Sequence, residues 1–225
     1  MDIEQILFDI AEALRVPVLV LTLIAFALVI VEFGALMAEL FRRRDRSAVR
    51  LEAGVEQARA AVRAGDTVGA RAALASVSWS VSMLSALAAI VEHVGRPDAE
   101  ARAAKALADF DYVCIRRLER TRILVRFGPA LGLMGTLIPL SPALAGLANG
   151  DVVTLTENLR LAFSVTVAGL LIGAFAFAIS LIRDRLYGQD FSDAEYIANA
   201  LVTGPAGGPT TTMPVQVPPP AGVAP

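Results

Sequence analysis

Hydrophobic and polar positions divide the chain into three long apolar stretches and a charged, helix-forming region between the first two. The first stretch covers residues 16–41 and contains Glu32 and Glu39; the second and third cover 127–148 and 161–182. A helix that crosses a bilayer needs about 20 predominantly apolar residues. The pattern therefore predicts an all-α integral membrane protein with three transmembrane helices.

The segments outside these stretches also have helical patterns, with Gly65 and Gly95 at two expected breaks. From about Asp98 the pattern continues without a break into the second stretch, which predicts one long helix leaving the membrane. The expected division is an amphipathic N-terminal helix outside at 1–15, a cytoplasmic helical region at 42–126, an outside loop at 149–160, a cytoplasmic helix at 183–203 and a disordered Pro/Gly-rich tail at 204–225.

The basic residues predict the orientation. All but Arg15 and Arg160 of the 20 Lys and Arg residues lie in 42–126 or after residue 182. Because cytoplasmic loops are enriched in Lys and Arg, we expect an outside N-terminus and a cytoplasmic C-terminus in the cytoplasmic (plasma) membrane. The arginines of 116–126 are interpreted as a topology signal that also contacts anionic membrane lipids.

Residues 72–91 leave one alternative topology open. They are uncharged, rich in serine and alanine, and long enough to be a fourth span. Inserting them would carry the arginines of 96–126 outside or remove the second span. We therefore expect a cytoplasmic helix packed against its neighbours.

Catalytic and metal-binding signatures are missing from the sequence. Cys114 and His93 are the only residues of their types, so no intrachain disulfide and no Cys/His metal cluster can form. There is no phosphate-binding loop and no nucleophile elbow. We expect no enzyme activity, no cofactor and no metal. The net charge of −2 gives no indication of nucleic acid binding.

Small residues and hydroxyls recur on one face of the second and third spans. Such residues let helices approach closely, and hydroxyls can bond across helices or to water. This spacing predicts a packed oligomer with a polar centre, although ordinary membrane packing would give a similar pattern. The positions are Gly128, Gly132, Gly135, Thr136 and Pro139 in the second span, and Thr166, Gly169, Gly173 and Ser180 in the third.

Two strings carry a resemblance to a known family. LERTRILVRFGPALGLMGTLIPL, from Leu118, resembles the approach and second helix of the MotA/TolQ/ExbB proton channel superfamily, and AFSVTVAGLLIGAFA resembles its third helix. The matching positions are Pro129, Gly132, Leu133, Gly135, Thr136, Thr166, Gly169 and Leu170. The sequence departs from the family pattern at Pro139, where a glycine is expected, and at Leu161, where a glutamate is expected.

The resemblance implies a pentamer of this chain around a small single-span partner that carries an intramembrane aspartate. Protons, or Na⁺, would move along hydroxyls of the ring. The residues assigned to this pathway are Thr136, Thr166, Glu32, Ser164 and Ser180, and those assigned to helix packing are Pro129, Gly132, Gly135, Pro139, Gly169 and Gly173.

Each assignment has a structural alternative. A helical threonine can satisfy its hydroxyl on its own helix, and Glu32 can pair with a basic residue near the cytoplasmic side. The predicted function is the pore-forming subunit of a complex that couples the proton-motive force to mechanical work or transport. The alternative is an oligomeric scaffold that conducts nothing. A substrate-specific transporter is weakly supported, because the three spans show no internal repeat.

Overall fold

A computed structural model describes residues 3–44 and 46–203, and every regular element in these residues is an α-helix. The predicted all-α class is confirmed. The helices are α1 (Ile3–Ala13), α2 (Arg15–Arg43), α3 (Ala48–Arg63), α4 (Thr67–Val77), α5 (Val81–Val91), α6 (Ala99–Ala148) and α7 (Val152–Thr203).

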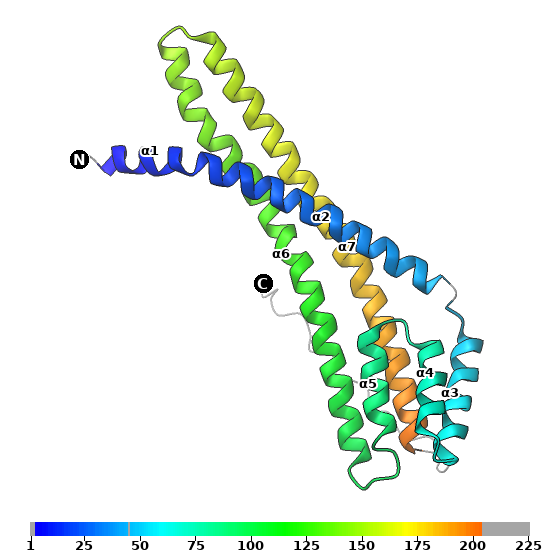
Figure 1. Ribbon diagram of the computed structural model, residues 1–225. Helices are drawn as coiled ribbons and strands as arrows, with labels where there is room; N and C mark the ends of the chain where they lie inside the picture. The colour runs from blue at the N-terminus through cyan, green and yellow to red at the C-terminus, as the bar shows by residue number, and fades with distance from the viewer. Residues whose placement is uncertain (1–2, 45, 204–225) are drawn as a thin grey trace, which may run out of the picture.

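Helices α6 and α7 form one long antiparallel hairpin, which runs the length of the molecule (Figure 1). At 1.5 Å per residue, each helix is about 75 to 78 Å long. The turn between them contains only residues 149–151, and Gly150 has φ +76°, a left-handed conformation that glycine adopts without strain. The single long helix expected from Asp98 is therefore present as α6, and it continues through three prolines, Pro129, Pro139 and Pro142.

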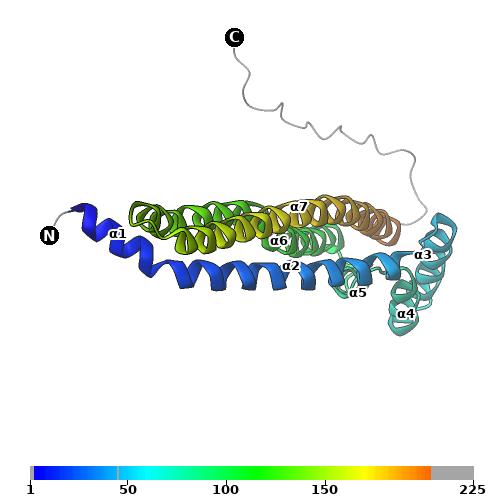
Figure 2. The same ribbon diagram turned by 90° about the horizontal axis from the view of Figure 1, so that it is seen from above.

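Helix α2 lies against one side of the α6–α7 hairpin and crosses it at an angle (Figures 1 and 2). Three stretches of the described residues are long and apolar enough to cross a membrane: Phe8–Arg43, Ala99–Ala148 and Val152–Thr203. The expected three spans fall within these stretches.

Helices α3 to α5 pack beside the C-terminal half of α7 and the start of α6 (Figure 1). Their ends are set by capping residues. The side chains of Ser47, Asp66 and Ser80 each accept a backbone N–H at the start of α3, α4 and α5. Gly65, expected as a helix stop, has φ +74° between α3 and α4.

The buried side chains form two separate hydrophobic cores. One lies among α3 to α7 and the other among α2, α6 and α7, within the apolar stretches. Members of the first core include Val77, Met83, Leu87, Ile90, Phe110 and Ile197; members of the second include Val29, Leu36, Leu131, Ile172 and Ile179.

We expected one helix at residues 72–91, but these residues belong to two helices, α4 and α5. Ser78, Trp79 and Ser80 separate α4 from α5, because Ser80 has an extended backbone and caps the start of α5. Each of these helices has 11 residues, about 16 Å, and cannot cross a core of about 30 Å. Residues 72–91 therefore do not form the continuous helix that a fourth span would need.

Two other expected boundaries differ in the structure. Of the loop expected at 149–160, only 149–151 is non-helical, because α7 already begins at Val152. No break separates the third span from the helix expected at 183–203, since both belong to α7. Helix α1 ends at Ala13, close to the expected boundary at residue 15. The tail at 204–225 lies outside the described residues.

Candidate functional site

The glycines of the second and third spans face each other within one chain. A Cβ placed on Gly169 would lie 2.6 Å from the carbonyl oxygen of Gly128 and 2.7 Å from the Cα of Gly132. A Cβ on Gly173 would lie 2.9 Å from the Cδ of Pro129. Because backbone atoms cannot move aside as a flexible side chain can, these glycines let α6 and α7 approach closely. Gly135 and Pro139 are also buried on this side of α6.

The four predicted hydroxyls all donate to carbonyl oxygens of their own helices. Thr136 donates to Leu133 at 2.8 Å, and Thr166 donates to Ala162 at 3.0 Å with the Gly132 carbonyl at 3.4 Å. Ser164 and Ser180 donate to Arg160 and Phe177. Each hydroxyl oxygen retains lone pairs that can accept a proton or a water hydrogen. Thr136 and Thr166 are half-buried, Ser164 is exposed and Ser180 is buried. Their role in a pore stays a prediction.

Glu32 contacts Arg183 rather than lying alone among apolar side chains. The Arg183 guanidinium forms an ion pair with the Glu32 carboxylate and a 3.1 Å hydrogen bond with the hydroxyl of Thr121. Arg183 is only 4% exposed, and Thr121 is fully buried. Glu32 thus has a basic partner, which was the predicted alternative to a proton site. This contact joins α2, α6 and α7 at one level.

A second group of charges ties the end of α2 to α7. Arg43 forms an ion pair with Asp190, which is 1% exposed, and lies 3.6 Å from Glu39. Burial raises the pKa of Asp190 above its ordinary value, although the Arg43 guanidinium opposes that rise. We refer to Glu32, Glu39, Arg43, Thr121, Arg183 and Asp190 together as the polar layer, because ion pairs and hydrogen bonds connect them.

The polar layer extends to the start of α5 through a tryptophan. Arg46 contacts Asp193 at 2.5 Å, and the indole N–H of Trp79 donates to the same carboxylate at 3.2 Å. The Arg46 guanidinium also lies 5.8 Å from the centroid of the Trp79 ring. These contacts link the segment after α2, the turn before α5 and the C-terminal half of α7.

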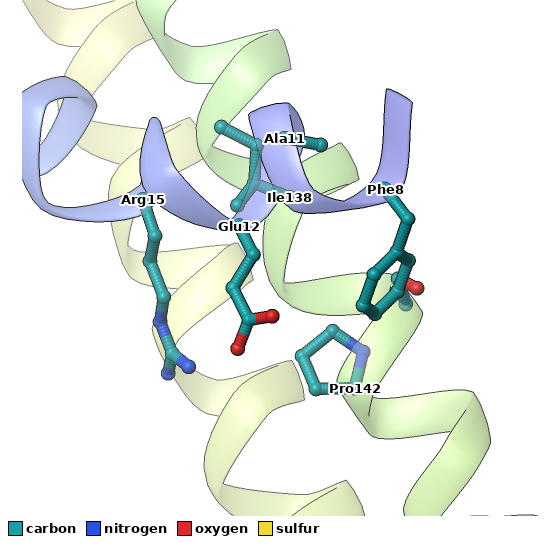
Figure 3. Close-up of a pocket in the computed structure, with 7 residues that line it drawn as sticks. Phe8, Ala11, Glu12, Arg15, Ile138 and Pro142 are labelled. Atoms are coloured by element: carbon teal, nitrogen blue, oxygen red, sulfur yellow. The ribbon is translucent and has the colours of Figure 1, made fainter. Parts of the chain in front are cut away.

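At the opposite end of α2, the N-terminal helix contacts the α6–α7 hairpin. Figure 3 shows Phe8, Glu12 and Arg15 of this end facing Ile138 and Pro142 of α6. They enclose a cavity of about 20 Å³, room for a single water. The Arg15 guanidinium donates to the Asn158 side chain of α7 at 2.9 Å. The prolines at 139 and 142 cannot donate to the carbonyls four residues earlier, so the Gly135 and Ile138 carbonyls have lost their usual helical partners.

Sequence reasoning missed the polar layer, although a signal for it was present. Buried positions on α7 recur at alternating spacings of three and four, as in a coiled-coil seam. The small-residue face of the third span ends at Ser180, and the next members of the same series are Arg183, Tyr187 and Asp190. Extending the face beyond the apolar stretch would have predicted these three residues as buried.

The described residues contain no group of three or more His, Cys, Asp and Glu side chains that could hold a metal ion.

Comparison with known families supports the resemblance found in the sequence. Residues 98–190 match the model of the MotA/TolQ/ExbB proton channel family. The match covers all of α6, the turn and α7 as far as the polar layer. It is consistent with a member of this superfamily, and the family implies a channel-type membrane protein. No curated protein and no solved structure matched the chain.

Proposed function

We propose that this chain is the pore-forming subunit of a complex driven by the proton-motive force. In this proposal, five copies surround a single-span partner whose intramembrane aspartate is protonated and deprotonated in turn. The observation that carries the proposal is the family match over the α6–α7 hairpin, in a chain with three membrane-length helices. Moving one charge through 100 mV supplies about 2.3 kcal/mol, so several protons could drive a conformational cycle.

Apolar surface on the hairpin is consistent with such an assembly. Within the membrane-length stretches, α6 and α7 expose many large side chains, which either lipid or further copies of the chain must cover. Thr136 and Thr166 are the proposed pore-lining hydroxyls, with Glu32, Ser164 and Ser180 as further members of the pathway. The exposed side chains include Leu133, Leu137, Leu140, Phe163, Val167 and Leu170.

The proposed orientation has the N-terminus outside and α3 to α5 in the cytoplasm. Arg42 and Arg43 directly follow the first expected span, Arg183 directly follows the third, and Arg43 and Arg183 belong to the polar layer. A fluorescent protein that folds only in the cytoplasm should therefore be bright when fused after residue 225. A dark fusion with intact membrane insertion would contradict this orientation.

Removing the proposed hydroxyls tests the pore. We expect Thr136→Val and Thr166→Val each to lower proton flux about tenfold in vesicles that contain the full chain and its co-purified partner, since a lost polar contact of this kind corresponds to about that factor. Thr156→Val is the matched control, because Thr156 lies outside the expected spans and donates to Val152 at 2.8 Å. Unchanged flux in both span variants would remove the pore-lining assignment.

One observation favours the alternative of a non-conducting scaffold. The glycine faces are used between α6 and α7 of one chain, and all four hydroxyls already donate within their helices. Imaging of the purified complex distinguishes the two functions. A fivefold ring around additional helical density, from a short protein with one intramembrane Asp, supports the motor, whereas an assembly without this density supports the scaffold.

A further inference from the structure

A polar cavity of about 160 Å³ lies where α2, α6 and α7 meet at the polar layer. It lies at the end of the apolar spans that carries most of the arginines. Side chains from all three helices line it: Glu32 and Glu39 of α2, Arg117 and Arg120 of α6, and Arg183 and Tyr187 of α7.

Two buried donors in this lining have no hydrogen-bond partner. Tyr187 is 6% exposed, and its hydroxyl contacts no acceptor among the described residues. The Nε of Arg183 is also buried and has no hydrogen-bond partner, since the carboxylate of Glu39 lies 3.6 Å away, beyond hydrogen-bond distance. Buried polar groups nearly always have a partner in native structures, so this cavity offers donors to a ligand that supplies acceptors.

The charges of the lining favour an anion. Glu32 and Glu39 lie within ion-pair distance of Arg183, and Glu39 also lies 3.6 Å from Arg43. In contrast, Arg117 and Arg120 have no acidic group within 4.0 Å in residues 3–44 and 46–203. Three arginines and two glutamates give the lining a net charge of +1. A group with one negative charge would complete the balance.

We propose that this cavity binds the phosphate of an anionic phospholipid. Tyr187 and the Nε of Arg183 would donate to the phosphate oxygens, and Arg117 and Arg120 would supply the compensating charge. A phosphodiester carries one negative charge and balances the lining, whereas free phosphate at neutral pH carries up to two and would exceed the balance. The inference goes beyond the proposed function, and it requires only that the three spans are inserted in a membrane.

Native mass spectrometry of the full-length protein, in detergent and with its co-purified partner, tests this site. The protein is titrated with phosphatidylglycerol and with phosphatidylcholine of the same acyl chains. We expect phosphatidylglycerol to bind at least about tenfold more tightly, and Tyr187→Phe and Arg120→Gln each to weaken it about tenfold, as for a lost hydrogen bond to a charged group. Arg122→Gln is the control, since it removes the same charge from α6 but its guanidinium contacts Asp184 at 3.2 Å.

Three outcomes would overturn the proposal. Equal binding of the two lipids would exclude a charge-selective site. If Arg122→Gln weakened phosphatidylglycerol binding as much as Arg120→Gln, the effect would come from the overall charge of the protein and not from this cavity. Displacement of the lipid by millimolar inorganic phosphate would assign the cavity to a free anion instead. Arg120 is exposed, so its variant keeps the test valid if Tyr187→Phe unfolds. Proton flux is measured separately, and its loss or retention in Thr136→Val does not affect this result.

Discussion

Arg183 shows how one residue can be both a topology signal and a structural link. It directly follows the third apolar stretch, where the positive-inside rule expects a cation, yet it is 4% exposed. A guanidinium keeps its charge at any accessible pH, so a buried one requires partners. Glu32 and Thr121 supply them from the two neighbouring helices. Glu32 therefore contributes to folding, and any proton-carrying role would have to operate from within this ion pair.

A double-mutant cycle measures the coupling free energy between Glu32 and Arg183. For Glu32→Gln and Arg183→Gln, we expect a coupling free energy of about 1–3 kcal/mol in thermal or denaturant unfolding, because the pair is mostly buried. The exposed pair of Arg122 and Asp184 is the matched control and should couple by less than about 1 kcal/mol. Similar coupling in both pairs would show that burial does not strengthen the inner pair.

Cys114 should be chemically unreactive in the folded protein. Burial raises the pKa of its thiol to about 11, and the nearby carboxylate of Asp190 adds to the rise. A raised thiol pKa means that the thiolate, the reactive form, is disfavoured at neutral pH. At pH 8 we expect alkylation by iodoacetamide to be about 100-fold slower than in the unfolded chain, and to accelerate up to about pH 11. Equal rates before and after unfolding would contradict the buried position.

At the scale of the element, α6 and α7 bury one line of residues, here called the seam, along their full lengths. The residue types in this seam change from one end to the other. Their buried positions recur mostly at spacings of three and four from the open end of the hairpin to the turn. Phe110, Cys114 and Leu118 occupy this seam in the N-terminal half of α6, Thr121 occupies it at the polar layer, and Gly128 and its neighbours occupy it in the apolar stretch. The glycines thus allow a close approach of α6 and α7 in the apolar stretches, where surrounding lipid would provide no hydrophobic driving force between helices.

Adding one methyl group to the seam should separate the helices. Gly169→Ala places a Cβ against the backbone of Gly128 and Gly132, and we expect a loss of about 1–3 kcal/mol of unfolding free energy in detergent. Gly188→Ala is the control on the same helix, because nothing lies within 4 Å of its Cβ. There we expect no loss, or a gain of about 1 kcal/mol from helix propensity. A similar loss in both variants would contradict the close approach.

The sequence predicted the elements better than the contacts between them. The three spans, the long α6 and the stop at Gly65 follow from local rules, namely apolar length, helical periodicity and glycine chemistry. The break at Ser78–Ser80 was missed because apolar residues continue across it, and only the capping contact of Ser80 marks it. The pairing of Glu32 with Arg183 depends on how α2 crosses α7, and residues 151 positions apart carry no local signal for it.

At the scale of the whole molecule, two hydrophobic cores are joined by charged groups. Hydrophobic contacts are non-directional, whereas ion pairs and hydrogen bonds require particular partners and so fix the register of the groups that form them. The contacts of Arg43 with Asp190 and of Arg183 with Glu32 fix α2 on α7 at two points, seven residues apart on α7. Arg46, Asp193 and Trp79 extend this connection to the turn between α4 and α5.

The unbroken course of α7 through this layer has a mechanical consequence. About 30 Å of the same helix extends beyond Arg183, to Thr203, and no glycine turn or loop interrupts it on the way. A stiff rod of this kind does not absorb a rotation between its halves. A tilt of about 5° at the membrane end would therefore swing the far end by about 3 Å, carrying Ile197 and the helices packed around it. Work done at the glycine-lined contact between α6 and α7 would reach the opposite end of the protein as movement.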